Sequence, residues 1–118
     1  MKKGNVVLTA IRQADGEIKK RPAVVLRVMP RYRDLLVCGI SSQLHQHVKG
    51  FDEIVSRADA DFASSGLLSD SLIRLGFLSS MPRKDIEGSI GAISPKRHKR
   101  LLKTLSDYLV GKRANGRK

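Results

Sequence analysis

The alternation of apolar and polar positions along the chain predicts a series of short strands followed by one helix. Six stretches have the length and composition of strands: Val6–Ile11, Ala23–Met29, Leu35–Ile40, Phe51–Val55, Ser71–Leu78 and Ser89–Ile93. Turns and irregular segments connect them, and residues 57–69 lack a clean apolar stripe, which predicts a loop with a short helical turn. Strands connected in this way pair antiparallel.

The helix is predicted near the end of the chain. Ser94 is a good N-cap, Pro95 suits the first helical position, and Gly111 supplies a stop. Apolar side chains, with one histidine, recur between these limits at spacings of three and four: His98, Leu101, Leu102, Leu105 and Leu109. The fold class expected is therefore mainly β (α+β): a small, antiparallel, partly closed barrel with a C-terminal helix packed against it.

The second predicted strand has an unusual entrance. Lys19, Lys20 and Arg21 run directly into Pro22. Because proline cannot donate a hydrogen bond to a neighbouring strand, we expect Pro22 to open the strand and Arg21 to lie at its entrance.

Composition fits one globular domain with an aliphatic core. The chain has 118 residues, of which 41% are hydrophobic and 4% aromatic, with no tryptophan. We expect a single domain over residues 1–111 and a flexible basic tail over residues 112–118.

The net charge of +12 is concentrated at the two ends of the chain. Residues 1–34 carry nine Lys or Arg against three acids, and residues 95–118 carry nine against one. Such clustering favours a polyanionic partner, either nucleic acid or an acidic protein, over a merely solvated surface.

Cys38 is the single cysteine, and it lies in an apolar stretch, so we expect a buried side chain and no intramolecular disulfide. The three histidines, His45, His47 and His98, do not form a recognisable zinc-binding pattern, and no metal or other cofactor is expected. Neither a signal peptide nor a stretch of membrane-spanning length is visible, which predicts a cytoplasmic protein without a membrane interaction.

A candidate site follows from the pairing of two neighbouring strands. If the strands at 23–29 and 35–40 pair, Arg21 comes close to Ser41 and Ser42, which end the second of them. Alternation in the strand at 71–78 places Leu72, Arg74 and Gly76 on one face. Arg74 is then either a charge at a sheet edge or a residue directed into a site.

Five motifs in this order resemble the MazF/PemK family of toxin endoribonucleases, which belong to bacterial type II toxin–antitoxin pairs. They are Gly4 to Leu8, Lys20 to Leu26, Gly39 to Gln43, Gly66-Leu67 to Arg74, and Ile90 to Ser94. The resemblance implies an SH3-like barrel that forms a homodimer, binds an acidic antitoxin protein and cleaves single-stranded RNA without a metal. In such enzymes the ribose 2′-OH attacks the adjacent phosphate, which leaves a 2′,3′-cyclic phosphate and a 5′-OH.

The resemblance also implies roles for individual residues. The family's arginine before the proline corresponds to Arg21, and its hydroxyl residue at the end of the next strand corresponds to Ser41. A forked guanidinium suits the charge that spreads over the oxygens of a phosphorane-like transition state. We expect RNA to be bound further by Arg12, Lys19, Lys20, Ser42, Gln43 and Arg74.

The chain departs from the family pattern at the general base. A carboxylate shortly before the arginine serves as the base in some members, and Glu17 stands near that position, with Asp15 as the alternative. In one branch an acid follows the late-strand arginine by two residues, whereas Gly76 stands there in this chain. The alternative function is therefore a non-catalytic nucleic-acid-binding module on the same SH3-like barrel. A third interpretation, compatible with the first, is that the basic surface binds chiefly an acidic antitoxin peptide.

Overall fold

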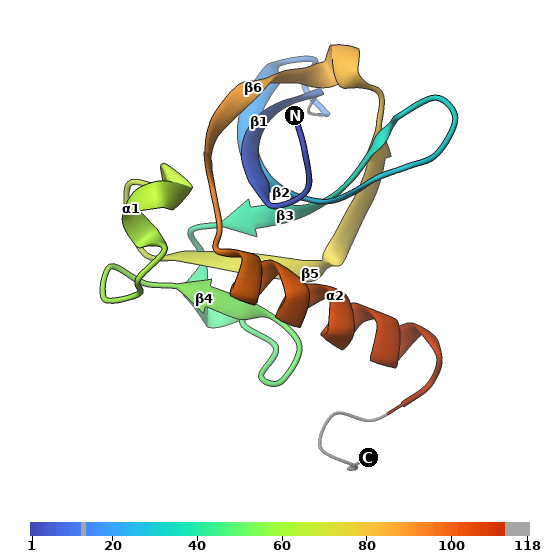
Figure 1. Ribbon diagram of the computed structural model, residues 1–118. Helices are drawn as coiled ribbons and strands as arrows, with labels where there is room; N and C mark the ends of the chain where they lie inside the picture. Colours follow the sequence, from blue (N-terminus) through green and yellow to red (C-terminus); the bar gives the residue numbers. More distant parts are fainter. Residues whose placement is uncertain (13, 113–118) are drawn as a thin grey trace.

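The computed structural model describes residues 1–12 and 14–112, without the side chains of residues 11 and 12 (Figure 1). Arg12 is thus described by its backbone alone, and all of the expected basic tail except Lys112 lies outside the described residues. In chain order the elements are β1 (Asn5–Arg12), β2 (Ile18–Val28), β3 (Leu35–Ser41), η1 (Leu44–Gln46), β4 (Glu53–Val55), α1 (Phe62–Ser65), β5 (Ser71–Met81), η2 (Arg83–Asp85), β6 (Ile86–Ala92) and α2 (Pro95–Leu109).

The described strands form one antiparallel sheet in the order β4-β5-β3-β2-β1-β6. Figure 1 shows this sheet curling into a half-barrel, with α2 crossing one side of it. Register shifts occur between β1 and β6, between β2 and β3, and between β3 and β5. Such bulges bend strands and let a sheet curl. The predicted fold class, mainly β with a C-terminal helix, is confirmed.

The prediction that Pro22 opens a strand is wrong. β2 begins at Ile18 and pairs with β1 through Arg21 and Pro22, with Pro22 opposite Leu8. The pairing of β2 with β3 begins only at Ala23, so at Pro22 one side of β2 has no strand partner. A residue without an N–H is tolerated at such a one-sided position. Arg21 consequently lies inside the β1–β2 hairpin rather than at the entrance of a strand.

The other predicted strands exist with shifted ends. β4 is limited to Glu53–Val55, whereas β5 extends three residues further than predicted, to Met81. β6 already begins at Ile86, three residues before the predicted start at Ser89. The loop with a short helical turn predicted over residues 57–69 is confirmed by α1.

A close backbone approach holds α1 against β6. A Cβ atom on Gly91 would lie 2.3 Å from the carbonyl oxygen of Ser64, so only glycine fits there without a shift. The Ser64 hydroxyl also donates to the carbonyl oxygen of Ala92 at 3.0 Å. The loop that carries α1 is thereby fixed to the edge of the sheet.

Buried side chains form two clusters on the two faces of the sheet. The larger contains Val24, Leu26 and Cys38 from the central strands and receives Leu101 and Leu105 from α2. The smaller cluster lies on the other face and consists of Val7, Ala23, Val25, Leu35, Val37 and Ile86. Both clusters are aliphatic, as the composition predicts.

The predicted limits of α2 are confirmed. The Ser94 hydroxyl accepts a hydrogen bond from the backbone N–H of Arg97, and Gly111 has the positive φ of a helix stop, 83°. His98 is buried and donates from Nε2 to the carbonyl oxygen of Leu26 at 2.8 Å. Leu109 is an exception to the predicted stripe: it is 69% exposed because the last turn extends past the sheet (Figure 1).

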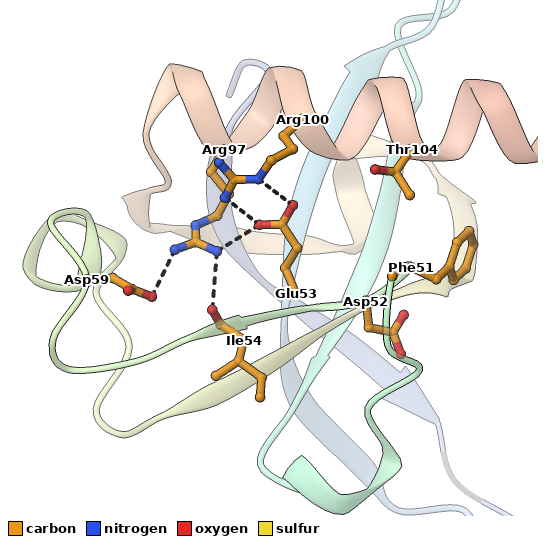
Figure 2. A pocket seen from close by; sticks show the side chains of 9 residues that line it. Phe51, Asp52, Glu53, Ile54, Asp59, Arg97, Arg100 and Thr104 are labelled. Carbon is orange, nitrogen blue, oxygen red and sulfur yellow. Dashed lines mark hydrogen bonds and ion pairs between the residues drawn. The ribbon is translucent and has the colours of Figure 1, made fainter. Parts of the chain in front are cut away.

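The guanidinium of Arg97 joins α2 to β4 and to the loop that follows β4 (Figure 2). Its five N–H donors are matched by five hydrogen bonds of 2.8–3.2 Å. The acceptors are both carboxylate oxygens of Asp61, one each of Glu53 and Asp59, and the carbonyl oxygen of Ile54. Sequence reasoning did not single out this ion-pair cluster.

Asp61 is the most enclosed carboxylate of the cluster, with 6% of its surface exposed. Burial alone would raise its pKa, but hydrogen bonds from Arg97 and from the backbone N–H of Ser94 outweigh burial and lower the pKa below its ordinary value. A lowered pKa in the folded state means that ionised Asp61 stabilises the fold above its unfolded-state pKa and that this contribution is lost as the pH falls.

No helix within the described ranges is long and apolar enough to cross a membrane.

Replacing Asp61 with asparagine should destabilise the protein by about 3 kcal/mol at neutral pH, because a buried guanidinium loses its main counter-charge. The difference from the wild type should shrink below about pH 4, because the Asp61 carboxylate is then protonated first in the unfolded chain and, at still lower pH, in the folded protein. Urea unfolding at neutral and acidic pH measures both effects.

Asp107→Asn is the matched control, because Asp107 forms an ion pair with the exposed Lys103 on the surface of α2. This substitution should lower the free energy of unfolding by less than about 0.5 kcal/mol. Equal losses of stability in Asp61→Asn and Asp107→Asn would contradict the conclusion that the buried ion-pair cluster stabilises the fold.

Candidate active site

Among the hollows in the described part of the molecule, two are candidate ligand sites. The first, of about 420 Å³, lies between α2 and β4 and is lined by the ion-pair cluster (Figure 2). Its guanidinium groups are already bound: Arg97 as described, and Arg100 to both oxygens of Glu53 at 2.8 and 2.9 Å. With its cations neutralised in this way, the hollow is a poor receptor for phosphate.

The second hollow, which we call the sheet pocket, has a volume of about 770 Å³ and lies over β1, β2, β3 and β5. Its polar lining residues are Thr9, Arg21, Ser41, Gln43, Gln46, Arg74 and Ser79, and its apolar ones include Pro22, Ala23, Val37, Gly39, Phe77, Leu78 and Met81. It therefore combines two guanidinium groups with hydroxyl and amide groups on an apolar floor.

The strand register explains why these residues meet. In β3, Gly39 lies between Ala23 of β2 and Arg74 of β5. Continuing the β2–β3 register by two residues places Arg21 opposite Ser41. Residues opposite one another, and residues two apart in a strand, share a face of the sheet. The pocket thus continues the face that carries the smaller core cluster.

Hydrogen bonds fix the backbone around Arg21 and Ser41. The Thr9 hydroxyl donates to the carbonyl oxygen of Arg21 at 3.0 Å, which ties β1 to the catalytic candidate. The backbone N–H of Gln43 donates to the Ser41 hydroxyl oxygen at 3.0 Å. This bond occupies a lone pair of the hydroxyl and leaves its O–H free to donate toward the pocket.

Arg74 lines the sheet pocket rather than the edge of the sheet. β5 lies between β4 and β3, and Arg74 pairs with Gly39. Its strand neighbours Ile73 and Leu75 point into the larger core cluster on the opposite face. The alternation predicted for this strand holds at these three residues.

Four of the predicted site residues lie outside the pocket lining. Glu17 is exposed in the turn before β2, where its backbone N–H donates to Asp15 Oδ1 at 2.9 Å. Lys19 and Lys20 are exposed on β2, and Lys20 forms a 3.3 Å ion pair with Glu87 of β6. Ser42, just after β3, is exposed and is also absent from the lining. The side chain of Arg12 lies outside the described residues.

The described lining of the sheet pocket contains no carboxylate and no histidine. The pocket is consequently electropositive and can bind a phosphodiester without an acidic group in its wall that repels it. Cys38 contributes no nucleophile, because it belongs to the core cluster on the opposite face. Burial, with a smaller contribution from the negative charge of Asp52, raises the pKa of its thiol to about 12.

Thr9 and Phe77 are among the pocket residues that sequence reasoning missed. Thr9 is buried in β1, where nothing in the local pattern distinguishes it from a core residue. Phe77 follows Gly76 within a predicted strand, and a glycine inside a strand is a recognised sign of a bulge. That sign could have indicated that Phe77 leaves the regular alternation.

Comparisons with known proteins bear on the fold and on the family of the chain. Residues 2–109 match the family described as PemK-like, MazF-like toxin of type II toxin-antitoxin system. A search of the curated proteins finds no match. Among solved structures, the chain is similar to the Mycobacterium tuberculosis toxin MazF-mt6, with a TM-score of 0.66 and 17% sequence identity, over 90% of this chain and 96% of that chain. The structural likeness shows a shared fold, and the family match spans most of the sequence. The chain therefore belongs to the PemK-like, MazF-like family of toxins of type II toxin–antitoxin systems.

Proposed function

We propose that this protein is a toxin that cleaves single-stranded RNA as a metal-independent endoribonuclease. Toxins of its family are generally endoribonucleases, and family membership implies an antitoxin partner. The observation that carries the proposal is the sheet pocket, which gathers Arg21, Ser41 and Arg74 from three adjacent strands. A phosphodiester seated there meets two permanent positive charges and a hydroxyl donor.

In the proposed reaction the 2′-OH of a ribose attacks the adjacent phosphorus, and the bond to the 5′-oxygen of the next nucleotide breaks. The products are a 2′,3′-cyclic phosphate and a 5′-OH, so no water is consumed. The phosphorane-like transition state carries more negative charge on its equatorial oxygens than the substrate does. Arg21 binds two of these oxygens with its guanidinium fork, and Arg74 adds a second positive charge.

Ser41 and Gln43 hold the substrate in this scheme. The free O–H of Ser41 donates to a phosphate oxygen or to the ribose, and the Gln43 side chain contributes donors and an acceptor at the pocket rim. Lys19, Lys20 and Ser42 lie outside the pocket, where the two cations attract the RNA backbone without touching the reacting phosphate. We place the Arg12 side chain in the same RNA-binding group.

The general base is assigned to Glu17 rather than Asp15. Asp15 Oδ1 accepts the backbone N–H of Glu17 and so serves the turn between β1 and β2. Glu17 stands four residues before Arg21 and is exposed. In this proposal RNA binding brings the β1–β2 turn over the pocket, so that the Glu17 carboxylate takes the proton of the 2′-OH.

The partners follow from the charge and from the family. An acidic antitoxin segment can occupy the same electropositive pocket and thereby block RNA. We further propose that the toxin is a homodimer and acts in the cytoplasm, where its RNA substrates are. The alternative function, a nucleic-acid-binding module without catalysis, is separated from the endoribonuclease by the first of the following predictions.

Arg21→Ala should reduce RNA cleavage by on the order of a hundredfold to a thousandfold, because one charged transition-state donor is lost. RNA affinity should fall much less, since the other cations remain. Arg21→Lys should remain strongly impaired because it keeps the charge but loses the fork. Cleavage of a long single-stranded RNA in EDTA, with detection of 5′-OH ends, measures the rate.

Lys96→Ala is the control, an exposed cation at the start of α2 on the opposite side of the sheet from the pocket, and it should keep most of the activity. If the wild-type protein, freed of antitoxin, yields no fragments with 5′-OH ends, the endoribonuclease proposal is wrong. If the wild type binds RNA without cleaving it and Arg21→Ala only weakens that binding, the non-catalytic binding module is correct.

Glu17→Gln should slow cleavage by on the order of a hundredfold or more, the range expected when a general base is removed. Asp15→Asn should have a smaller effect, because its amide oxygen can still accept the hydrogen bond of the turn. Single-turnover rates with saturating enzyme separate this loss from weaker binding. Equal rates for Glu17→Gln and the wild type would assign the base elsewhere.

A further inference from the structure

β5 contains a bulge of three residues where it passes β3. Cys38 of β3 pairs with Leu78, yet the next residue, Gly39, pairs with Arg74. Leu75, Gly76 and Phe77 are therefore extra residues of β5 without a partner in β3. Leu75 is fully buried in the larger core cluster, and its backbone N–H is bound by Asp52 Oδ1 at 3.0 Å. Phe77 is directed the other way, into the sheet pocket.

The ring of Phe77 takes the place of a side chain at Gly39. A Cβ atom built on Gly39 would lie 2.5 Å from Phe77 Cδ2 and 3.1 Å from Cε2, far inside contact distance. Glycine at this position of a central strand costs stability, since it has no side chain to pack. Here it allows the ring to rest directly on the backbone of β3, between the strands that carry Arg21 and Arg74.

Arg74 approaches the same ring. Its guanidinium carbon lies 5.4 Å from the centroid of Phe77, within cation–π range. Even with Gly39 and Arg74 in contact, Phe77 remains 57% exposed. A large aromatic side chain is thus held against β3 and presented to solvent inside an electropositive pocket.

The other aromatic residues of the chain are arranged differently. Phe51 and Tyr108 pack on each other with ring centroids 5.1 Å apart, and Phe62 packs against the larger core cluster. Tyr32 is exposed beside Arg31 in the turn between β2 and β3 and does not line the pocket. Within the described lining of the sheet pocket, the aromatic side chain is that of Phe77.

We propose that Phe77, positioned by Gly39 and Arg74, is a stacking platform for a nucleobase of the RNA next to the phosphate bound by Arg21. The proposal rests on the proposed function in taking RNA as the ligand. Aromatic rings stack on bases of any kind, so Phe77 contributes affinity and orients the strand, whereas hydrogen bonds select the sequence. Phe77 acts through substrate positioning and takes no part in proton transfer.

The test compares the binding of two fluorescent oligonucleotides of about ten nucleotides, a length that spans one single-strand site. One is a random-sequence 2′-fluoro RNA, which cannot be cleaved because it lacks the 2′-OH. The other is an abasic oligonucleotide of equal length, which offers phosphates without bases. Fluorescence anisotropy at fixed salt gives the affinity of the wild type and of Phe77→Leu, Phe77→Trp and Tyr32→Leu for each.

Phe77→Leu should weaken binding of the base-bearing oligonucleotide by about fivefold to a hundredfold and change binding of the abasic one by less than about twofold. Phe77→Trp should retain or improve the affinity for bases, and Tyr32→Leu should show no selective loss. Should Phe77→Leu not fold, Gly39→Ala displaces the ring without removing it and should give the same selective loss.

An unchanged affinity of Phe77→Leu for both oligonucleotides, or equal losses for both, would overturn the proposal. The outcome is separable from that of the proposed function, because the binding measurement requires no cleavage. A wild type that cleaves no RNA but shows selective loss in Phe77→Leu contradicts only the endoribonuclease. An active wild type without selective loss contradicts only the stacking platform.

Discussion

The guanidinium of Arg97 is the interaction on which the arrangement of α2 depends. Three carboxylates and one carbonyl group converge on it from β4 and from the loop before α1, and each of its N–H donors is used. Asp61 also accepts the backbone N–H of Ser94, so the same carboxylate orients the start of the helix. A buried ionic cluster of this kind contributes little net stability compared with apolar packing, but each member is costly to remove. Its role is therefore to fix where α2 begins, which in turn directs Leu101 and Leu105 onto the sheet.

The two faces of the curled sheet have different roles. On one face, Val24, Leu26 and Cys38 meet α2 and build the larger core. On the other, the smaller core gives way to the sheet pocket as apolar residues are replaced by Arg21, Ser41 and Arg74 at the same alternating positions. Because strand alternation assigns each residue to a face, the central strands stabilise the fold with one set of side chains and present the candidate site with the other.

Much of the fold could be predicted from local patterns, because strand alternation and helix capping are encoded by neighbouring residues. The limits of α2 follow from Ser94, Pro95 and Gly111, and the core strand β3 from its apolar run. The remaining features depend on contacts between segments that are far apart in the sequence. Pro22 is accommodated inside β2 because β3 pairs only beyond it, and the bulge that exposes Phe77 requires knowledge of the β3–β5 register. The proximity of Arg21 to Ser41 could be anticipated, because the two residues lie at the ends of neighbouring predicted strands. The ion-pair cluster of Arg97 could not, because it joins residues up to 44 positions apart and leaves no local pattern.

The pairing of β1 with β6 has a consequence for the synthesis of the protein. Asn5 lies opposite Ala92, and the backbone N–H of Ile93 donates to the carbonyl oxygen of Gly4 at 2.9 Å, so the first strand meets its outer partner only when nearly the whole domain has been made. Arg97 and the apolar residues of α2 come later still. Such long-range contacts are formed slowly during folding. A nascent chain therefore completes this fold only after β6 and α2 have been synthesised, and a product truncated before β6 lacks both the strand that pairs with β1 and the helix that covers the core.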